Sequence, residues 1–561
     1  MKSFILVACA TFLLVVPTIY AQAPRPNGDD ADELNPIEPN SPEFKDRERR
    51  NCRIEFRRVD GACTNIGSPK RQLWGSTNRP HFTYFNGLSS VVATGKNLPS
   101  PRRISNILCK QTRNIFDRRS LNEMTTIFGQ FIDHTLVATP VNDDEPMFIK
   151  MPENDPLFAN MTELKFFRSE RVKVVRGSRV ERPQNSLTSA LDLVSVYGPN
   201  EGRLKVLRSF RNGLMETGPG NLLILNNARL NNAPQNRKSF FITGDHRANE
   251  HPVLTSVHTL FLREHNSIAK ELQAAFPRWK EERLFQTARK INIAQFQKIV
   301  IKEWYPAITG RQLPAYNGFV RDTDPTVSLV FSTAAFRVGH TLVGNVVNRR
   351  GRGNTVLPSL PFMNVFFQSV RLIQNNGIDE FVRGALVSRA QRIDLQVHDI
   401  LRNFLFTNVN GEEGLDLIAL NLQRSRDHAL PSYNRIRRKF LGSRARNFLQ
   451  ITKNRNIATA LQTAYGSVDK VEAWIGMMAE DHAPRSSMGP TLLAVWQREF
   501  VRIRDGDQFY FEREGAFTKE MKMKIPRVRQ LFTNADIFRG IVLRNSGIQR
   551  RDLKRRMFFV N

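Results

Sequence analysis

Cysteine is scarce in this chain, which has four cysteines among 561 residues. Cys9 lies in the apolar N-terminal stretch, so few disulfides can form. The stability of the fold must therefore come mainly from an apolar core, which a chain of this length can readily build. Zinc-finger spacings and glycine-rich phosphate loops are also missing, and their absence argues against a dedicated nucleic-acid partner.

Long hydrophobic runs are missing as well. After the first 23 residues, no stretch of the sequence approaches the roughly 20 apolar residues that a membrane-spanning helix needs. The N-terminal run from Phe4 to Val16 is too short; it follows Lys2 and precedes Ala21-Gln22-Ala23, a pattern typical of a cleaved secretory signal. We expect residues 1–23 to be a signal peptide and the mature chain to be secreted, extracellular and without a transmembrane segment. An N-terminal membrane anchor is the alternative.

Acidic residues are outnumbered, since 83 Lys+Arg against 53 Asp+Glu give a formal net charge of +30. Such a charge favours anionic partners such as matrix polysaccharides or microbial surfaces. Residues 24–50 are the acidic exception, rich in Pro and Asn with little to bury, and we expect them to be disordered. They end in Arg47-Glu48-Arg49-Arg50, which resembles a basic processing site. The segment is therefore either a propeptide or a charged linker.

The rest of the chain, residues 51–561, shows no repeat, long linker or composition break, and we expect one large domain. Helical periodicity is clear after Pro252, where one apolar stripe contains Leu254, Val257, Phe261, Ile268 and Leu272. Ala334 to Val347 is also predicted to be a helix. Strand signals are few and short. The fold class is therefore mainly α, a single large helical domain around a buried cofactor.

Two short strings carry candidate chemistry. In GQFIDH, Gln130, Asp133 and His134 fall at i, i+3 and i+4, so a helix would place them on one face. In GDHRANEH, Arg247, Glu250 and His251 repeat that spacing. Each string offers a carboxylate beside groups suited to proton transfer or charge stabilisation.

A third string, AFRVGH, places His340 directly after Gly339, where a missing side chain would let a flat ligand approach the backbone. Two separated histidines plus an arginine suit iron ligation on one side of a haem and acid–base chemistry on the other. The combination predicts a peroxidase.

In order and spacing these strings resemble the animal haem peroxidases of the peroxidase–cyclooxygenase superfamily. The resemblance covers nearly everything after the first fifty residues. It continues through TSALDLVSVYG (Thr188–Gly198), LTSVHTLFLREHN (Leu254–Asn266), LDLIALNLQRSRDHALPSYN (Leu415–Asn434) and GPTLLAVWQREFVRIRDGDQFYFE (Gly489–Glu512). It implies a helical haem-peroxidase domain.

The resemblance also implies roles on the peroxide-binding side. His134 would be the base that takes a proton from H2O2 and returns it to the leaving oxygen, and Arg247 would stabilise the developing negative charge. Gln130 corresponds to the residue that orients water and halide. His258 and His265 are interpreted as packing or surface residues.

Asp133 and Glu250 match carboxylates that form ester links to a haem b derivative in this family. Some members have a methionine after Glu250 that forms a third link. Here that residue is His251, which cannot form it, so the resemblance implies two protein links at most.

On the opposite face of the haem, His340 matches the iron ligand of the family. Asn421 matches the residue that accepts a hydrogen bond from that imidazole and so sets its orientation. Arg337 and Arg424 fit contacts to the haem propionates, although each could be an ordinary ion-pair arginine.

The family's calcium site is where this sequence departs from the pattern. Most members have Asp after the distal histidine, and here it is Thr135. Thr188, the Ala190 carbonyl and Asp192 are retained, but Val194 replaces a serine. Because calcium prefers several oxygen ligands with balancing charge, we expect it to bind weakly or not at all.

The resemblance pairs Cys52 with Cys63 in an opening disulfide loop. Cys109 is then an odd thiol, either buried or available for an intermolecular bond. Asn160 belongs to an Asn-x-Thr glycosylation acceptor.

Two functions remain open. The first is a secreted peroxidase that uses H2O2 to oxidise halides, thiocyanate or phenols such as tyrosine. The second is a matrix or adhesion protein that keeps the fold, with catalysis secondary. Retention of His134, Arg247, His340 and Asn421 favours the first. A third function, a fatty-acid oxygenase, is not supported, because this chain has no tyrosine near His340 placed for radical chemistry. The sequence does not identify the electron donor.

Overall fold

The computed structural model describes residues 52, 54–65, 98–158, 161–173, 181–321, 323–406, 414–533 and 536–560. The predicted signal peptide, the predicted disordered segment 24–50 and Asn160 lie outside the described residues. In the part of the chain that is described, no helix is long and apolar enough to cross a membrane.

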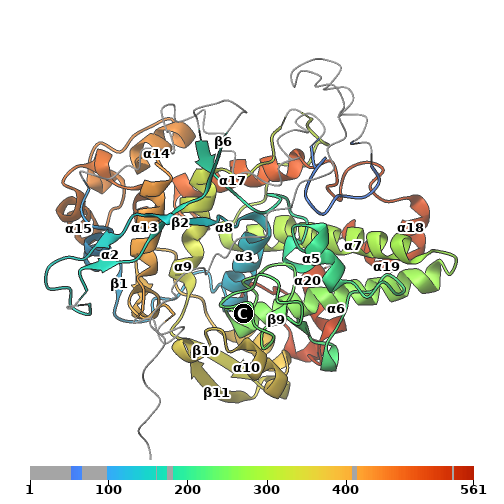
Figure 1. Cartoon of the computed structure of the whole chain (residues 1–561). Coiled ribbons are helices and arrows are strands. Elements are labelled where there is room, and N and C mark those ends of the chain that lie inside the picture. Colours follow the sequence, from blue (N-terminus) through green and yellow to red (C-terminus); the bar gives the residue numbers. More distant parts are fainter. Residues whose placement is uncertain are drawn as a thin grey trace, which may run out of the picture.

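Helices build most of the structure, as the sequence predicts (Figure 1). Those of the N-terminal half are α2 (Pro101–Leu108), α3 (Glu123–Leu136), α4 (Val194–Tyr197), α5 (Glu201–Leu207), α6 (Pro252–Ala275) and α7 (Glu281–Lys298). Those that follow are α8 (Tyr305–Thr309), α9 (Gly339–Leu342), α10 (Ser369–Asn376), α11 (Asp379–Val387), α12 (Asp399–Arg402), α13 (Leu417–Asp427) and α14 (Tyr433–Leu441). The C-terminal ones are α15 (Arg455–Tyr465), α16 (Ala473–Ala479), α17 (Pro490–Asp505), α18 (Lys519–Lys524), α19 (Pro526–Leu531) and α20 (Ile537–Asn545).

The strands are short and form two-stranded pairs. One pair is parallel, β1 (Lys110–Gln111) with β12 (Val397–His398). The others are antiparallel: β2 (Val141–Pro146) with β5 (Phe167–Ser169), β3 (Ile149–Lys150) with β4 (Glu163–Leu164), β6 (Arg171–Lys173) with β7 (Glu181–Pro183), β8 (Ile224–Leu225) with β9 (Phe241–Ile242), and β10 (Val346–Arg350) with β11 (Val356–Pro361).

Helix α3 lies near the centre of the molecule, with α6 and α7 packed together to one side (Figure 1). Asn122 caps its N-terminus by accepting a hydrogen bond from Thr125 N at 3.2 Å. Gly129 allows a close approach by Trp304, because an added Cβ would lie 3.1 Å from the indole ring. Buried side chains along α3 pack against the core, and this packing holds its polar face in a defined position.

Helix α6 confirms the predicted apolar stripe. Leu254, Val257, Phe261, Ile268 and Leu272 are all fully buried. Pro252 occupies the first helical turn, where its missing N–H costs no hydrogen bond. The stripe therefore anchors α6 in the core and fixes the chain that enters it.

The prediction of a continuous helix from Ala334 to Val347 is wrong. The segment consists of a π-turn ending at Ala334, a 3₁₀ turn over Ala335–Val338 and the short helix α9, and then becomes strand β10. The β-branched residues Val346 and Val347 pair with β11, and such side chains favour a pleated surface. Tertiary pairing therefore overrides the helical pattern here.

The predicted disulfide between Cys52 and Cys63 is confirmed. Cys109 is a free, fully buried thiol, and burial raises its pKa. Of the two alternatives for this cysteine, the structure supports the buried one.

Candidate active site

One cavity of about 520 Å3 brings the predicted haem-site residues together. The residues come from α3, from the loop before α6, from the segment around α9 and from α13. They are Gln130, Asp133, His134, Arg247, Glu250, Arg337, His340, Asn421 and Arg424. Residues as far apart in the chain as 130 and 424 thus share one cavity, as the motifs predict.

Helix α3 presents Gln130, Asp133 and His134 to this cavity. Arg247 and Glu250 do not lie on a helix, because residues 244–250 form bends and turns. His251 caps the start of α6 by accepting a hydrogen bond from Val253 N. Proline disfavours helical backbone at the residue that precedes it. Pro252 therefore keeps His251 out of the helix, and α6 begins at Pro252.

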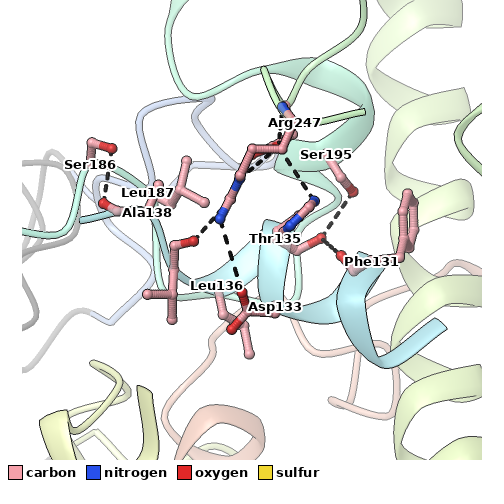
Figure 2. Close-up of polar contacts among 12 residues, drawn as sticks. Phe131, Asp133, Thr135, Leu136, Ala138, Ser186, Leu187, Ser195 and Arg247 are labelled. Atoms are coloured by element: carbon pink, nitrogen blue, oxygen red, sulfur yellow. Dashed lines mark hydrogen bonds and ion pairs between the residues drawn. The ribbon is translucent and has the colours of Figure 1, made fainter. Parts of the chain in front are cut away.

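The two strings nevertheless meet in space. Gln130 Nε2 donates to Glu250 Oε2 at 2.8 Å, and Arg247 Nη1 lies 4.0 Å from Asp133 Oδ2. The contact between Arg247 and Asp133 is visible in Figure 2. The carboxyl groups of the two strings therefore border the same space as His134.

Asp245 is a site residue that the sequence interpretation missed. Its two carboxylate oxygens accept from Arg247 Nε at 3.0 Å and from Arg247 Nη2 at 2.8 Å. Its Oδ1 also accepts from the Arg247 backbone N at 2.8 Å and lies 3.5 Å from His134 Nδ1, longer than a well-formed hydrogen bond. The signal was available as the aspartate two residues before Arg247 in GDHR.

Burial and this ion pair set the charges around the cavity. Burial, with the Arg247 charge acting in the same direction, holds the pKa of His134 well below its usual value. Burial also acts to raise the pKa of Asp245, but the Arg247 charge and the Arg247 hydrogen bonds outweigh it and the pKa lies well below normal. At neutral pH the site therefore combines a neutral imidazole with an ionised Asp245–Arg247 pair, which suits a base beside a fixed cation.

The two carboxyl groups of the motifs behave differently from Asp245. Burial raises the pKa of Asp133 to about 6 and that of Glu250 to about 8. Glu250 is thus mainly protonated near neutral pH. A carboxyl group in the cavity wall that carries little charge can lie against an apolar ligand at low cost.

His340 is held by an amide contact with α13. Asn421 Nδ2 lies 2.7 Å from His340 Nδ1, and Arg337 Nη1 donates to Asn421 Oδ1 at 2.5 Å. Asn421 therefore bridges His340 and Arg337, and this contact orients the imidazole. Burial lowers the pKa of His340 to about 3, so the imidazole is neutral.

Arg424 lines the cavity but also belongs to an ion pair. Its Nη1 donates to Asp427 Oδ2 and to Ser169 Oγ, each at 2.8 Å. Its guanidinium lies 4.2 Å from the centre of the Phe166 ring. These contacts hold the side chain at the wall of the cavity.

The remaining predicted residues lie outside the cavity. His258 and His265 are fully buried in α6, and His265 contacts the Tyr197 hydroxyl at 2.8 Å, so both are packing residues. Thr188, Ala190 and Asp192 lie in the buried loop before α4. The same loop contacts the C-terminal end of α3 through Asn185, whose Nδ2 donates to Leu136 O at 2.9 Å, and these three residues do not line the cavity.

Comparison with known proteins gives a consistent result. The family model described as "Animal haem peroxidase" matches residues 56–549. Eosinophil peroxidase of Homo sapiens is 34% identical over 538 residues, covering 85% of this chain and 74% of that protein. Peroxinectin A of Dictyostelium discoideum is 34% identical over 499 residues, covering 84% and 90%.

Solved structures extend the similarity to three dimensions. Peroxidase A from Dictyostelium discoideum superposes with a TM-score of 0.77 at 30% identity, covering 89% of this chain and 99% of that chain. The fatty acid α-dioxygenase of Oryza sativa has a TM-score of 0.71 at 15% identity, covering 92% of both chains. At that identity the second similarity concerns the fold alone.

Proposed function

Because this chain belongs to the animal haem peroxidase family and is a peroxidase, we propose that it is a secreted enzyme that uses H2O2 to oxidise small donors at the cavity described above. The donors would be halides, thiocyanate or phenols such as tyrosine. The observation that carries the proposal is the single cavity shared by His134, Arg247 and His340.

The cavity fits the haem that this family uses. His340 is half-buried, neutral and part of the wall, and a Cβ added to Gly339 would meet no atom within 4 Å, so the backbone there is open to a flat ligand. His340 would bind the iron, Asp133 and Glu250 would form ester links, and Arg337 and Arg424 would contact the propionates. When bound, haem supplies the redox centre that accepts oxidising equivalents from H2O2 and passes them to the donor.

The protein's own groups manage the proton. His134 is neutral and can take the proton of H2O2 and then return it to the leaving oxygen. Arg247, held by Asp245, presents a fixed positive charge to the negative charge that develops. Gln130, bound to Glu250, provides a further polar group beside them for positioning water or an anionic donor.

Two variants test these roles. His340→Ala is expected to lose haem, measured by absorption spectroscopy, because the iron loses its protein ligand. His134→Ala is expected to keep haem but to react with H2O2 about 10²- to 10⁴-fold more slowly in stopped flow. His482→Ala is the control, since His482 contacts the Ile393 carbonyl away from the cavity. A His134→Ala protein that reacts like the parent contradicts the assignment.

The donor is identified by turnover of the haem-loaded protein with bromide, iodide, thiocyanate and tyrosine. A peroxidase of small donors should oxidise at least one of them in a peroxide-dependent manner. Absence of turnover with all four would contradict the proposed donor class while leaving the peroxide reaction itself to be measured separately.

A further inference from the structure

The end of α3 that carries His134 is joined to α4 through Ser195 (Figure 2). Thr135 Oγ1 lies 2.9 Å from Ser195 Oγ and 3.0 Å from Phe131 O. A carbonyl only accepts, so the single hydroxyl proton of Thr135 goes to Phe131 and the Ser195 hydroxyl donates to Thr135. All three residues are fully buried, so water cannot take over these contacts if one partner is removed.

The backbone carbonyl of Ser195 makes the next connection. It accepts from Asp245 N at 3.1 Å, and His258 Nδ1 lies 3.0 Å from it. The Asp245 carboxylate binds Arg247, whose Nη2 donates to Val137 O at 2.9 Å, just beyond the end of α3. The contacts therefore form a closed ring that runs from α3 to α4, to the loop that carries Asp245 and Arg247 (the arginine loop), and back to the end of α3.

The family pattern assigns a calcium ion to this region, and the donor set does not fit one. Both oxygens of Asp192 are engaged, one by Thr188 Oγ1 at 2.7 Å and the other by Val194 N at 3.2 Å. The Thr135 hydroxyl is used by Phe131 and Ser195. Within the described ranges, no group of three or more His, Cys, Asp or Glu side chains could hold a metal ion. Calcium needs more free oxygen ligands than this.

The positive charge near Asp192 comes from the protein itself. Burial raises the pKa of Asp192, while the Arg57 charge, the Thr188 hydroxyl and the Arg289 charge act in the opposite direction. Arg57 and Arg289 are both buried. A divalent cation would have to share this space with two fixed guanidinium groups.

We propose that Ser195, Thr135 and Asp245 form a metal-free latch that sets the position of His134 relative to Arg247. Ser195 and Thr135 are then positioning residues for the reaction with peroxide, although neither lines the cavity. The inference rests on the proposed function, because it assigns His134 and Arg247 to the peroxide step.

The test uses haem-loaded Ser195→Ala and Thr135→Val, which each remove one hydroxyl of the latch. Both are expected to slow the reaction with H2O2 by roughly 10- to 100-fold, the range expected when reacting groups shift by up to about 1 Å. The double variant should be slowed no more than the slower single variant, because the two hydroxyls make one contact. Thr135→Ser keeps the hydroxyl and should restore the parental rate constant.

Thr259→Val is the matched control, since its buried hydroxyl bonds only to Thr255 O within α6. Latch variants that react no more slowly than Thr259→Val would overturn the proposal, as would a Thr135→Ser variant as slow as Thr135→Val. Failure of the proposed function would give a different result. In that case His134→Ala would react with H2O2 as fast as the parent protein, whatever the rate constants of the latch variants.

A second measurement does not depend on any variant. The parent protein is incubated with EGTA, and its calcium content, melting temperature and peroxide rate constant are compared before and after. A latch without an ion predicts no stoichiometric calcium and no change in the other two quantities. One calcium per chain, or a lower melting temperature after chelation, would overturn the proposal.

Discussion

His134 carries the proton chemistry of the proposed mechanism, and its surroundings keep the imidazole neutral. Because its folded-state pKa lies below the unfolded value of about 6.5, the base stays deprotonated as the pH falls through 6.5. The same shift means that His134 stabilises the fold fully above pH 6.5 and that this stability is lost as the pH falls below that value.

We predict that the rate constant for H2O2 at pH 5 remains within about twofold of its value at pH 7. An unshifted histidine with a pKa of about 6.5 would leave only about 3% of the base neutral at pH 5. Stopped-flow measurements from pH 5 to pH 7 distinguish a lowered pKa of His134 from an ordinary one. A decline with its midpoint near pH 6.5 would show that haem binding exposes His134 to solvent.

Asp133 and Glu250 are the residues whose covalent role can be tested directly. Both are half-buried carboxyl groups with raised pKa values, and both line the cavity. We predict that peroxide treatment of the haem-loaded protein makes haem resistant to acid–solvent extraction. Asp133→Asn combined with Glu250→Gln should release it. Haem peptides that contain neither residue, found by mass spectrometry, would count against the ester links.

At the scale of elements, the contact between α4 and the arginine loop is the closest approach near the site. A Cβ added to Gly244 would overlap the Val194 carbonyl and lie 2.5 Å from Gly198 N. Both are backbone atoms, so no side-chain rotation can relieve the overlap. The loop that carries Asp245 and Arg247 can therefore rest on α4 only with glycine at this position.

Gly244→Ala is predicted to lower the free energy of unfolding by about 1–3 kcal/mol and to slow the peroxide reaction, because the arginine loop must move away from α4 and carry Arg247 with it. Gly202→Ala in α5 is the control: an added Cβ would lie 3.4 Å from the Asn200 side chain, and helix propensity alone should make it neutral or slightly stabilising. Chemical denaturation of both proteins measures the difference. Equal stabilities would show that the loop does not depend on this contact.

At the scale of the whole molecule, the dominant property is the formal charge of +30. Many arginines already bind carboxylates inside the fold, such as Arg102 with Asp155 and Asp416, yet the excess of basic residues remains. We propose that this excess draws the enzyme to anionic matrix or microbial surfaces, where its oxidation products would act locally.

We predict that the protein binds a sulfated polysaccharide resin at low salt and elutes as the ionic strength rises, because screening shortens the range of surface charge to about 8 Å at 0.15 M. Retention on the uncharged resin is the control. Binding that does not respond to salt would point to a specific contact instead of a general surface effect.

The sequence by itself was enough to determine the family, the helical fold class and the residues around the cavity. Helical periodicity is a local property, so the face of α3 with Gln130, Asp133 and His134 and the apolar stripe of α6 could be predicted without coordinates. The Cys52–Cys63 disulfide followed from the family resemblance and is confirmed.

Tertiary structure alone decided how these parts are held in place. The ring through Thr135, Ser195, Asp245 and Arg247 joins residues from three separate segments, and no local pattern shows that a hydroxyl at 135 will meet one at 195. The strand at Val346–Arg350 and the position of the Asn421 amide likewise depend on distant partners, namely β11 and Arg337. Local spacing identifies which side chains can do the chemistry, but their position and hydrogen-bonding direction depend on contacts made only when distant segments pack together.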